Sequence, residues 1–361
     1  MKTALVSLLA VAVAAAGLAA QSAADTRVEA GWQALQQGDA DRAASAFHEA
    51  LQRNPRDANL HYGAGAAAHL LGRETDAVAS LTRALTLNPR LTAASELLGY
   101  IQYQQGDLDA AIHVYEQALV FAAGRATMQR RLEDWRKEAA VHSTLVERNG
   151  ARFSIIFDGR ADQALASRAS AVLERSFWTI GQKIGAYPSN RITVTLYTEQ
   201  QFRDIAHVPA WSSGAFDGKI RIPVQGVSQN LDEFDHVLVH ELTHAIVHGL
   251  AARGVPAWLQ EGLATYFEPR DPAAAQKRLQ SMGVNIPLSS LEGSFSGLNA
   301  EQARIAYAES LFAVDLLMHL ANGRMAVLIQ ALGNGQTLDA SFGQLGMRAA
   351  DFEAQVARRL R

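Results

Sequence analysis

The sequence contains no cysteine among its 361 residues. This absence excludes disulfide bonds, thiolate metal sites, cysteine nucleophiles and a lipid-modified N-terminal cysteine. Any metal ion must therefore be held by histidine, aspartate or glutamate side chains. The sequence also lacks an excess of one charge, because 33 basic and 36 acidic residues give a net charge of −3. No basic run stands out, so we expect no nucleic-acid partner.

Long apolar runs are missing after the first two dozen residues. Residues 1–24 begin with a positive Lys2, continue with a short apolar stretch over residues 4–20, and end in small residues. This pattern is typical of a signal peptide that is removed on export, and the alternative is an uncleaved anchor. We expect the mature chain to have no transmembrane segment and to be exported, either periplasmic or secreted. The lack of cysteine is compatible with an oxidising compartment.

The composition is that of a folded protein, since 48% of the residues are hydrophobic. Disorder over the whole chain is excluded, because it requires low hydrophobicity and high net charge. At about 100–200 residues per domain, the length predicts two domains.

The first half repeats itself with a period of 34 residues. Two series of glycines keep this spacing: Gly31, Gly65 and Gly99, and Gly38, Gly72 and Gly106. The second series lies where a turn between two paired helices is needed. Pro55 and Pro89 close the first two units, as expected for residues that end a helix.

These phased positions resemble three tetratricopeptide repeats over residues 25–124. The resemblance implies an all-α solenoid whose concave groove binds a protein or peptide partner. A spacer and a dimerisation surface are the alternatives. Residues 125–149, rich in arginine and glutamate, are expected to form a capping helix and linker.

Residues 150–361 have a different pattern. We expect strands at residues 153–157, 192–197 and 219–224, and Pro223 marks the last as an edge strand because proline cannot donate to a ladder. A helix is expected between the first two strands. Further helices are expected afterwards, at residues 231–250, 256–268, 300–320 and 324–332. Strands followed by helices indicate an α+β domain.

The helix at 231–250 carries an H-E-x-x-H motif, His240-Glu241-Leu242-Thr243-His244. Two histidines four residues apart differ by about 40° around a helix and by about 6 Å along it, so both can reach one ion. Glu241 lies on the same side, placed to touch a water molecule rather than the metal. The alternative is a helix with two packed or surface histidines.

A second predicted helix supplies Glu261, within Trp258-Leu259-Gln260-Glu261-Gly262-Leu263-Ala264. Two histidines and one glutamate are a known ligand set of catalytic zinc, which leaves the fourth position open. The small residues Gly262 and Ala264 allow this helix to pack close to the first one.

H-E-x-x-H followed by E-G-x-A is similar to the gluzincin metallopeptidases of the thermolysin-type superfamily, and residues 150–361 resemble the peptidase-MA-like domains. The resemblance implies a zincin-like fold with one Zn²⁺ per chain. It makes His240, His244 and Glu261 the ligands and Glu241 the general base. Thr265 stands where thermolysin-type sites place an aspartate that orients a ligand histidine.

Three further assignments concern the surroundings of this motif. Tyr307 is the candidate that stabilises the oxyanion, as the resemblance also implies, and its alternative is a core tyrosine. Gly214, Ala215 and Phe216 are expected to bind an extended substrate as an added strand. His236 and His248 continue the histidine series and are expected to be structural or solvent-facing.

The sequence thus predicts an exported zinc-dependent metallopeptidase that hydrolyses peptide bonds, with a repeat domain for its partner or substrate. One alternative is an exported scaffold whose peptidase domain is inactive. Another is a zinc hydrolase of a different bond, such as an amide in a cell-wall peptide.

Overall fold

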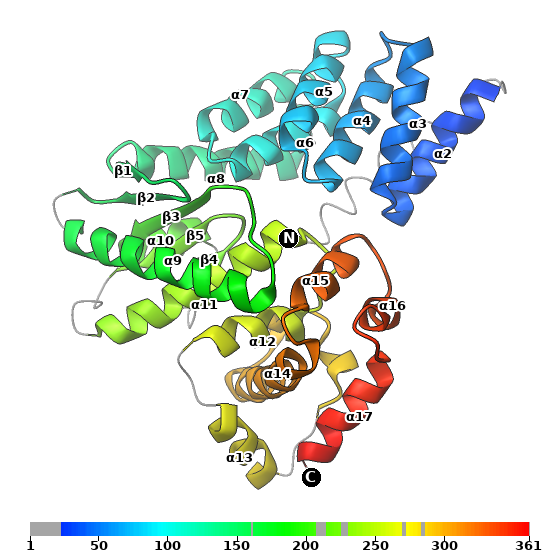
Figure 1. Cartoon of the computed structure of the whole chain (residues 1–361). Helices are drawn as coiled ribbons and strands as arrows, with labels where there is room; N and C mark the ends of the chain where they lie inside the picture. Colours follow the sequence, from blue (N-terminus) through cyan, green and yellow to red (C-terminus); the bar gives the residue numbers. More distant parts are fainter. Residues whose placement is uncertain are drawn as a thin grey trace. The chain divides into compact units, whose positions relative to one another are not determined.

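The computed structural model describes residues 23–159, 162–206, 214–224, 230–268, 272–282 and 286–360. The chain divides into two compact units, residues 1–143 and 144–361 (Figure 1). Of the expected signal peptide, only Ala23 and Ala24 are among the described residues.

The described residues of the first unit form three helical hairpins and a final helix. They are α2 (Ala23–Gln37) with α3 (Ala40–Arg53), α4 (Ala58–Leu70) with α5 (Glu74–Leu87), α6 (Thr92–Gln104) with α7 (Leu108–Leu119), and then α8 (Ala126–His142). The turn glycines Gly38, Gly72 and Gly106 have φ angles of 80°, 69° and 85°, which favour glycine. At Gly99 a Cβ atom would lie 2.5 Å from the Tyr115 ring, so only glycine lets α6 approach α7 this closely. The hairpins expected from the 34-residue period are confirmed.

The capping helix is shorter than the sequence predicts. It was expected to reach Asn149, but α8 ends at His142, and β1 (Val146–Asn149) belongs to the second unit. β1 pairs antiparallel with β2 (Phe153–Phe157), with Val146 opposite Phe157. The hydrogen bonds of this hairpin outweigh the helical preference of the arginine- and glutamate-rich sequence.

A mixed five-stranded sheet forms one layer of the second unit. Its order is β1-β2-β3-β5-β4, where β3 is Ile192–Tyr197, β4 is Ala215–Phe216 and β5 is Ile220–Pro223. The three inner strands are parallel, and the two outer ones run antiparallel to their neighbours.

The expectation of an edge strand at Pro223 is wrong, because β4 lies outside β5. β4 is short and pairs only with Ile220 and Arg221, so the missing N–H of Pro223 interrupts no ladder on that side. On the other side, Val224 continues the ladder by donating its N–H to the Tyr197 carbonyl at 2.8 Å.

Helices make up the rest of the second unit. They are α9 (Gln163–Ile184), α10 (Glu199–Ala206), α11 (Leu231–Leu250), α12 (Ala257–Phe267), α13 (Pro272–Met282), the 3₁₀ turns η2 (Leu288–Leu291) and η3 (Phe295–Gly297), α14 (Ala300–Ala321), α15 (Met325–Gly333), α16 (Leu338–Gly343) and α17 (Ala349–Leu360). Alternate residues of the inner strands, such as Ile155, Val194 and Ile220, are buried in one core with α9 and α11. α12 packs against both α11 and α14 (Figure 1).

Membrane-spanning segments were sought among the described residues. No single helix there is long and apolar enough to cross a bilayer. Helices α14 and α15 reach the required length and apolar character only together, and they form a pair bent by 110°.

Candidate metal centre

Helix α11 is anchored by one face and presents its other face to the site. Leu238, Leu242 and Ile246 are fully buried in the core. Its start is capped by Asn230, whose side chain accepts a hydrogen bond from the Glu233 N–H at 3.1 Å. His240 and His244 lie on the other side, as the four-residue spacing predicts.

Helix α12 approaches its neighbours closely because of Gly262. A Cβ atom at this position would lie 2.4 Å from the Ser310 carbonyl oxygen of α14. Trp258, Leu259 and Leu263 are buried and fix the orientation of α12. Glu261 therefore faces α11 rather than solvent.

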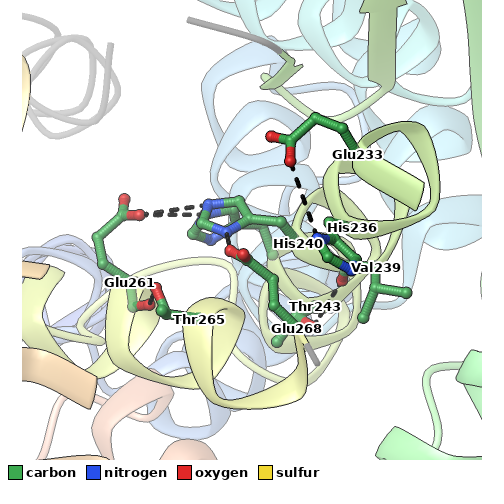
Figure 2. A network of polar contacts seen from close by, with 9 residues as sticks. Glu233, His236, Val239, His240, Thr243, Glu261, Thr265 and Glu268 are labelled. Carbon is green, nitrogen blue, oxygen red and sulfur yellow. Dashed lines mark hydrogen bonds and ion pairs between the residues drawn. The ribbon is translucent and has the colours of Figure 1, made fainter. Parts of the chain in front are cut away.

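The three expected ligands meet in one place. Figure 2 shows two of them, with Glu261 of α12 directed toward His240 of α11. The Nε2 atoms of His240 and His244 are 3.1 Å apart, and Glu261 Oε2 lies 3.6 Å and 3.5 Å from them. All three ligand atoms lie within 4.8 Å of one another. Glu261 Oε2 is buried and accepts no hydrogen bond from the described residues, although a buried oxygen normally has a partner. Two imidazoles and a carboxylate with this unpaired oxygen fit Zn²⁺.

A carboxylate that the sequence analysis missed completes the group. Glu268 Oε1 accepts a hydrogen bond from His240 Nδ1 at 2.6 Å (Figure 2). Thr265 cannot act in this way, because its hydroxyl donates to the Glu261 carbonyl of its own helix at 2.8 Å. Glu268 directly follows α12 and comes seven residues, about two helical turns, after Glu261, so it starts on the side of the helix that carries Glu261. That spacing was the signal available in the sequence.

The surroundings of the histidines are strongly negative. Burial lowers the pKa of His240, but the neighbouring carboxylates of Glu261 and Glu268 outweigh it and raise this pKa to about 10. Burial has the opposite effect on Glu261 and raises its pKa. The two histidines outweigh that effect and hold the pKa of Glu261 well below its usual range. The group therefore favours a positive charge at its centre, and a divalent cation would supply it.

Glu241 lies beside the ligands and is only 7% exposed. Burial raises its pKa above the usual range, against the opposing effect of His240 and His244. Gly214 lies next to it, since a Cβ atom there would be 2.9 Å from Glu241 Oε1. Gly214, the first of the three residues predicted to bind the substrate, therefore lies beside Glu241, the predicted general base.

Tyr307 also reaches this site from α14. Its ring centroid lies 6.5 Å from that of His240. Burial raises the pKa of Tyr307 above its ordinary value, and Glu261 raises it further, so the hydroxyl keeps its proton. Tyr266, five residues after Glu261, lies under the ammonium of Lys183, whose nitrogen is 5.4 Å from the centroid of the tyrosine ring.

The two other histidines of α11 do not belong to the ligand group. His236 Nδ1 is 3.8 Å from Glu233 Oε2, on the outer part of the helix. The His248 ring lies 5.4 Å from the ring of Phe216 in β4. Within the described residues, the metal-type group comprises His240, His244 and Glu261 alone.

Comparisons with known proteins agree with this layout. A family model described as the peptidase MA superfamily matches residues 174–354, half of the chain, and a tetratricopeptide repeat model matches residues 28–92 and 75–126. No curated protein matches the sequence. A similar solved structure is "First TPR of Spaghetti (RPAP3) bound to HSP90 peptide SRMEEVD". It is 21% identical with a TM-score of 0.31, and the alignment covers 32% of this chain and 95% of that one. The chain belongs to the peptidase MA superfamily, with tetratricopeptide repeats preceding its peptidase domain.

Proposed function

We propose that this protein is an exported zinc-dependent metallopeptidase that hydrolyses peptide bonds. The observation that carries the proposal is the convergence of His240, His244 and Glu261 beside the buried Glu241. His240, His244 and Glu261 would hold the metal, and Glu268 would orient His240. When bound, Zn²⁺ would act as a Lewis acid toward water and the substrate carbonyl.

Glu241 would transfer the proton, and Tyr307 would stabilise the negative charge that develops on the carbonyl oxygen. Glu241 takes a proton from the attacking water and returns it to the leaving amine, and its raised pKa suits a group that must do both. The Tyr307 hydroxyl keeps its proton and can donate a hydrogen bond to the carbonyl oxygen as negative charge develops there.

Strand β4 would bind the substrate chain. Among the described residues it is the last strand of the sheet on its side, and it lies next to α11. Gly214, directly before β4, is close to Glu241, and the Phe216 ring contacts the His248 ring. In an antiparallel pair every second residue turns its N–H and C=O away from the partner strand. An extended peptide can pair with these groups and so bring a peptide bond to Glu241.

The repeat unit would bind a protein or peptide, either the substrate itself or a separate partner. Stacked helical hairpins commonly serve this purpose by means of their concave surface. Export rests on residues 1–24, whose composition is typical of a cleaved signal peptide.

Metal content and hydrolysis test the proposal together. Residues 25–361, purified without a histidine tag, should contain one zinc ion per chain, and Glu261→Ala should contain none. The wild-type protein should cleave members of a broad peptide library, while Glu241→Gln keeps its zinc and loses nearly all cleavage.

The alternative functions give different results. Zinc without cleavage of any peptide, but with cleavage of cell-wall amides, would favour the other class of hydrolase. No zinc even after incubation with the ion would favour the inactive scaffold and contradict the proposal.

A further inference from the structure

Glu309 is a buried carboxylate that the proposed mechanism does not use. It lies in the middle of α14 and is 0% exposed. One of its oxygens, Oε1, accepts a hydrogen bond from the Ile286 N–H at 2.8 Å. The other, Oε2, is buried and has no hydrogen-bond partner among the residues that the structure describes. This single bond joins α14 to the start of the segment 286–298.

The segment 286–298 forms part of the wall around the candidate site. Phe295 packs edge-on against the Tyr307 ring, with centroids 5.5 Å apart. The Glu292 carbonyl accepts a hydrogen bond from the N–H of Ala257, the first residue of α12, at 3.0 Å. Leu288 and Leu291 are buried in the same core. The segment therefore contacts both Tyr307 and the helix that carries Glu261.

We propose that Glu309 is a positioning residue: it holds the segment 286–298 against Tyr307 and the start of α12, and this hold weakens when the carboxyl group ionises. The inference rests on the fold and does not depend on the proposed function.

The direction of the effect follows from the burial of the carboxyl group. Burial raises the pKa of Glu309 from 4.5 to about 7, against the opposing effect of the Ile286 N–H. A group whose pKa is higher in the closed arrangement stabilises that arrangement fully at pH values below its ordinary pKa. The stabilisation is lost as the pH rises to the higher value. Opening of the segment, which exposes Glu309 to water, therefore becomes easier from about pH 5 to about pH 7.

No charged neighbour accounts for the shift, whose only causes are burial and the Ile286 N–H. The helices and turn packed against α14 are α12, α13, α17 and η2. The titratable or charged side chains on these elements and on α14 itself are Glu261, Tyr266, Lys277, Arg278, Glu301, Arg304, Tyr307, Asp315, His319, Asp351, Glu353, Arg358 and Arg359, with Glu268 directly after α12.

Hydrogen exchange tests the inference without any activity measurement. Exchange of the segment 286–298 is followed on the full chain and corrected for the intrinsic effect of pH on exchange. In the wild type, the corrected opening should rise by about tenfold per pH unit between about pH 5 and about pH 7. In Glu309→Gln it should not change with pH, because the amide oxygen still accepts from Ile286 but does not titrate.

Glu301→Gln is the matched control, since Glu301 lies exposed in the first turn of the same helix. It should keep the wild-type pH dependence. Glu309→Ala, which removes the acceptor, should open more readily at every pH. A corrected wild-type opening that is constant with pH, or an unchanged dependence in Glu309→Gln, would overturn the inference. If Glu309→Gln fails to fold, the pH profiles of the wild type and Glu301→Gln are compared. A wild-type opening that is constant with pH, or a pH dependence that is lost in Glu301→Gln, would then overturn the inference.

Discussion

At the scale of single residues, Glu268 distinguishes this site from a bare set of three ligands. A ligand histidine normally donates its second ring N–H to a carboxylate or carbonyl, which fixes its orientation. Here the bond runs from His240 to Glu268 at 2.6 Å, and both side chains are largely buried. Thermolysin-type sites place an aspartate at the position of Thr265; here Glu268, directly after α12, contacts the histidine instead.

Replacement of Glu268 by alanine should weaken zinc binding by about 10–100-fold, because His240 would lose the acceptor that orients it. Competition with a chromophoric chelator measures this affinity. Glu233→Ala is the control: the Glu233 carboxylate lies 3.8 Å from His236, which is outside the ligand group, so its loss should leave the affinity unchanged. Equal affinities of Glu268→Ala and the wild type would remove Glu268 from this role.

Replacement of Tyr307 by phenylalanine should lower kcat by about 10²-fold, the usual effect of losing one oxyanion donor. The zinc content should stay the same, because Tyr307 is not a ligand. Tyr266→Phe is the matched control, and its kcat should not change, since Tyr266 packs under Lys183. An unaltered rate in Tyr307→Phe would show that the ring only fills the core.

Residue types and spacing allowed four of these positions to be predicted. His240, His244, Glu241 and Glu261 belong to patterns that chemistry restricts closely, so their convergence could be predicted from the sequence, and their roles stay predictions. Glu268 could not, because an acidic residue at the end of a helix is common and its partner lies on another helix. Its bond to His240 depends on how α12 crosses α11, which only the folded structure shows.

At the scale of elements, the close packing of α12 against α14 depends on one glycine. Gly262→Ala would place a Cβ atom 2.4 Å from a backbone oxygen of α14. Because a backbone atom yields less readily than a side chain, we expect a loss of about 1–3 kcal/mol in the free energy of unfolding. Chemical denaturation measures this loss. Gly343→Ala in α16 is the control, since no atom lies within 4 Å of a Cβ at that position, and its stability should not fall.

Long elements with a clear apolar period were predicted well, and short ones were not. The strands at 153–157 and 192–197 and the helix at 231–250 have the bounds that the sequence predicts. β4, with two residues, and β1, with four, carry too few side chains for a period to be recognised. Both outer strands are defined by their pairing with a neighbour, which is a tertiary contact.

At the scale of the whole molecule, the two units have separate cores. The candidate ligands all belong to the unit of residues 144–361. Zinc should therefore stabilise that unit alone, by about 2.7 kcal/mol at a free concentration of 100 times Kd. Scanning calorimetry of the full chain should show that a chelator lowers the Tm of this unit. The transition of the repeats should be the same with and without the chelator.

Glu261→Ala provides the control for the calorimetric experiment. Its transitions should not respond to zinc or to the chelator, because one ligand is missing. Equal shifts of both transitions in the wild type would mean that zinc also binds outside the His240–His244–Glu261 group, contrary to the prediction.

The 34-residue spacing of the hairpins also bears on how the gene can change. In a stack of this kind each unit is held by its immediate neighbours. Duplication or deletion of one whole unit therefore alters the length of the recognition surface without disturbing the glycines, turns and packing of the others. Unequal recombination within the first half can therefore vary the surface proposed to bind a partner, while it leaves the candidate metal ligands of the second half untouched.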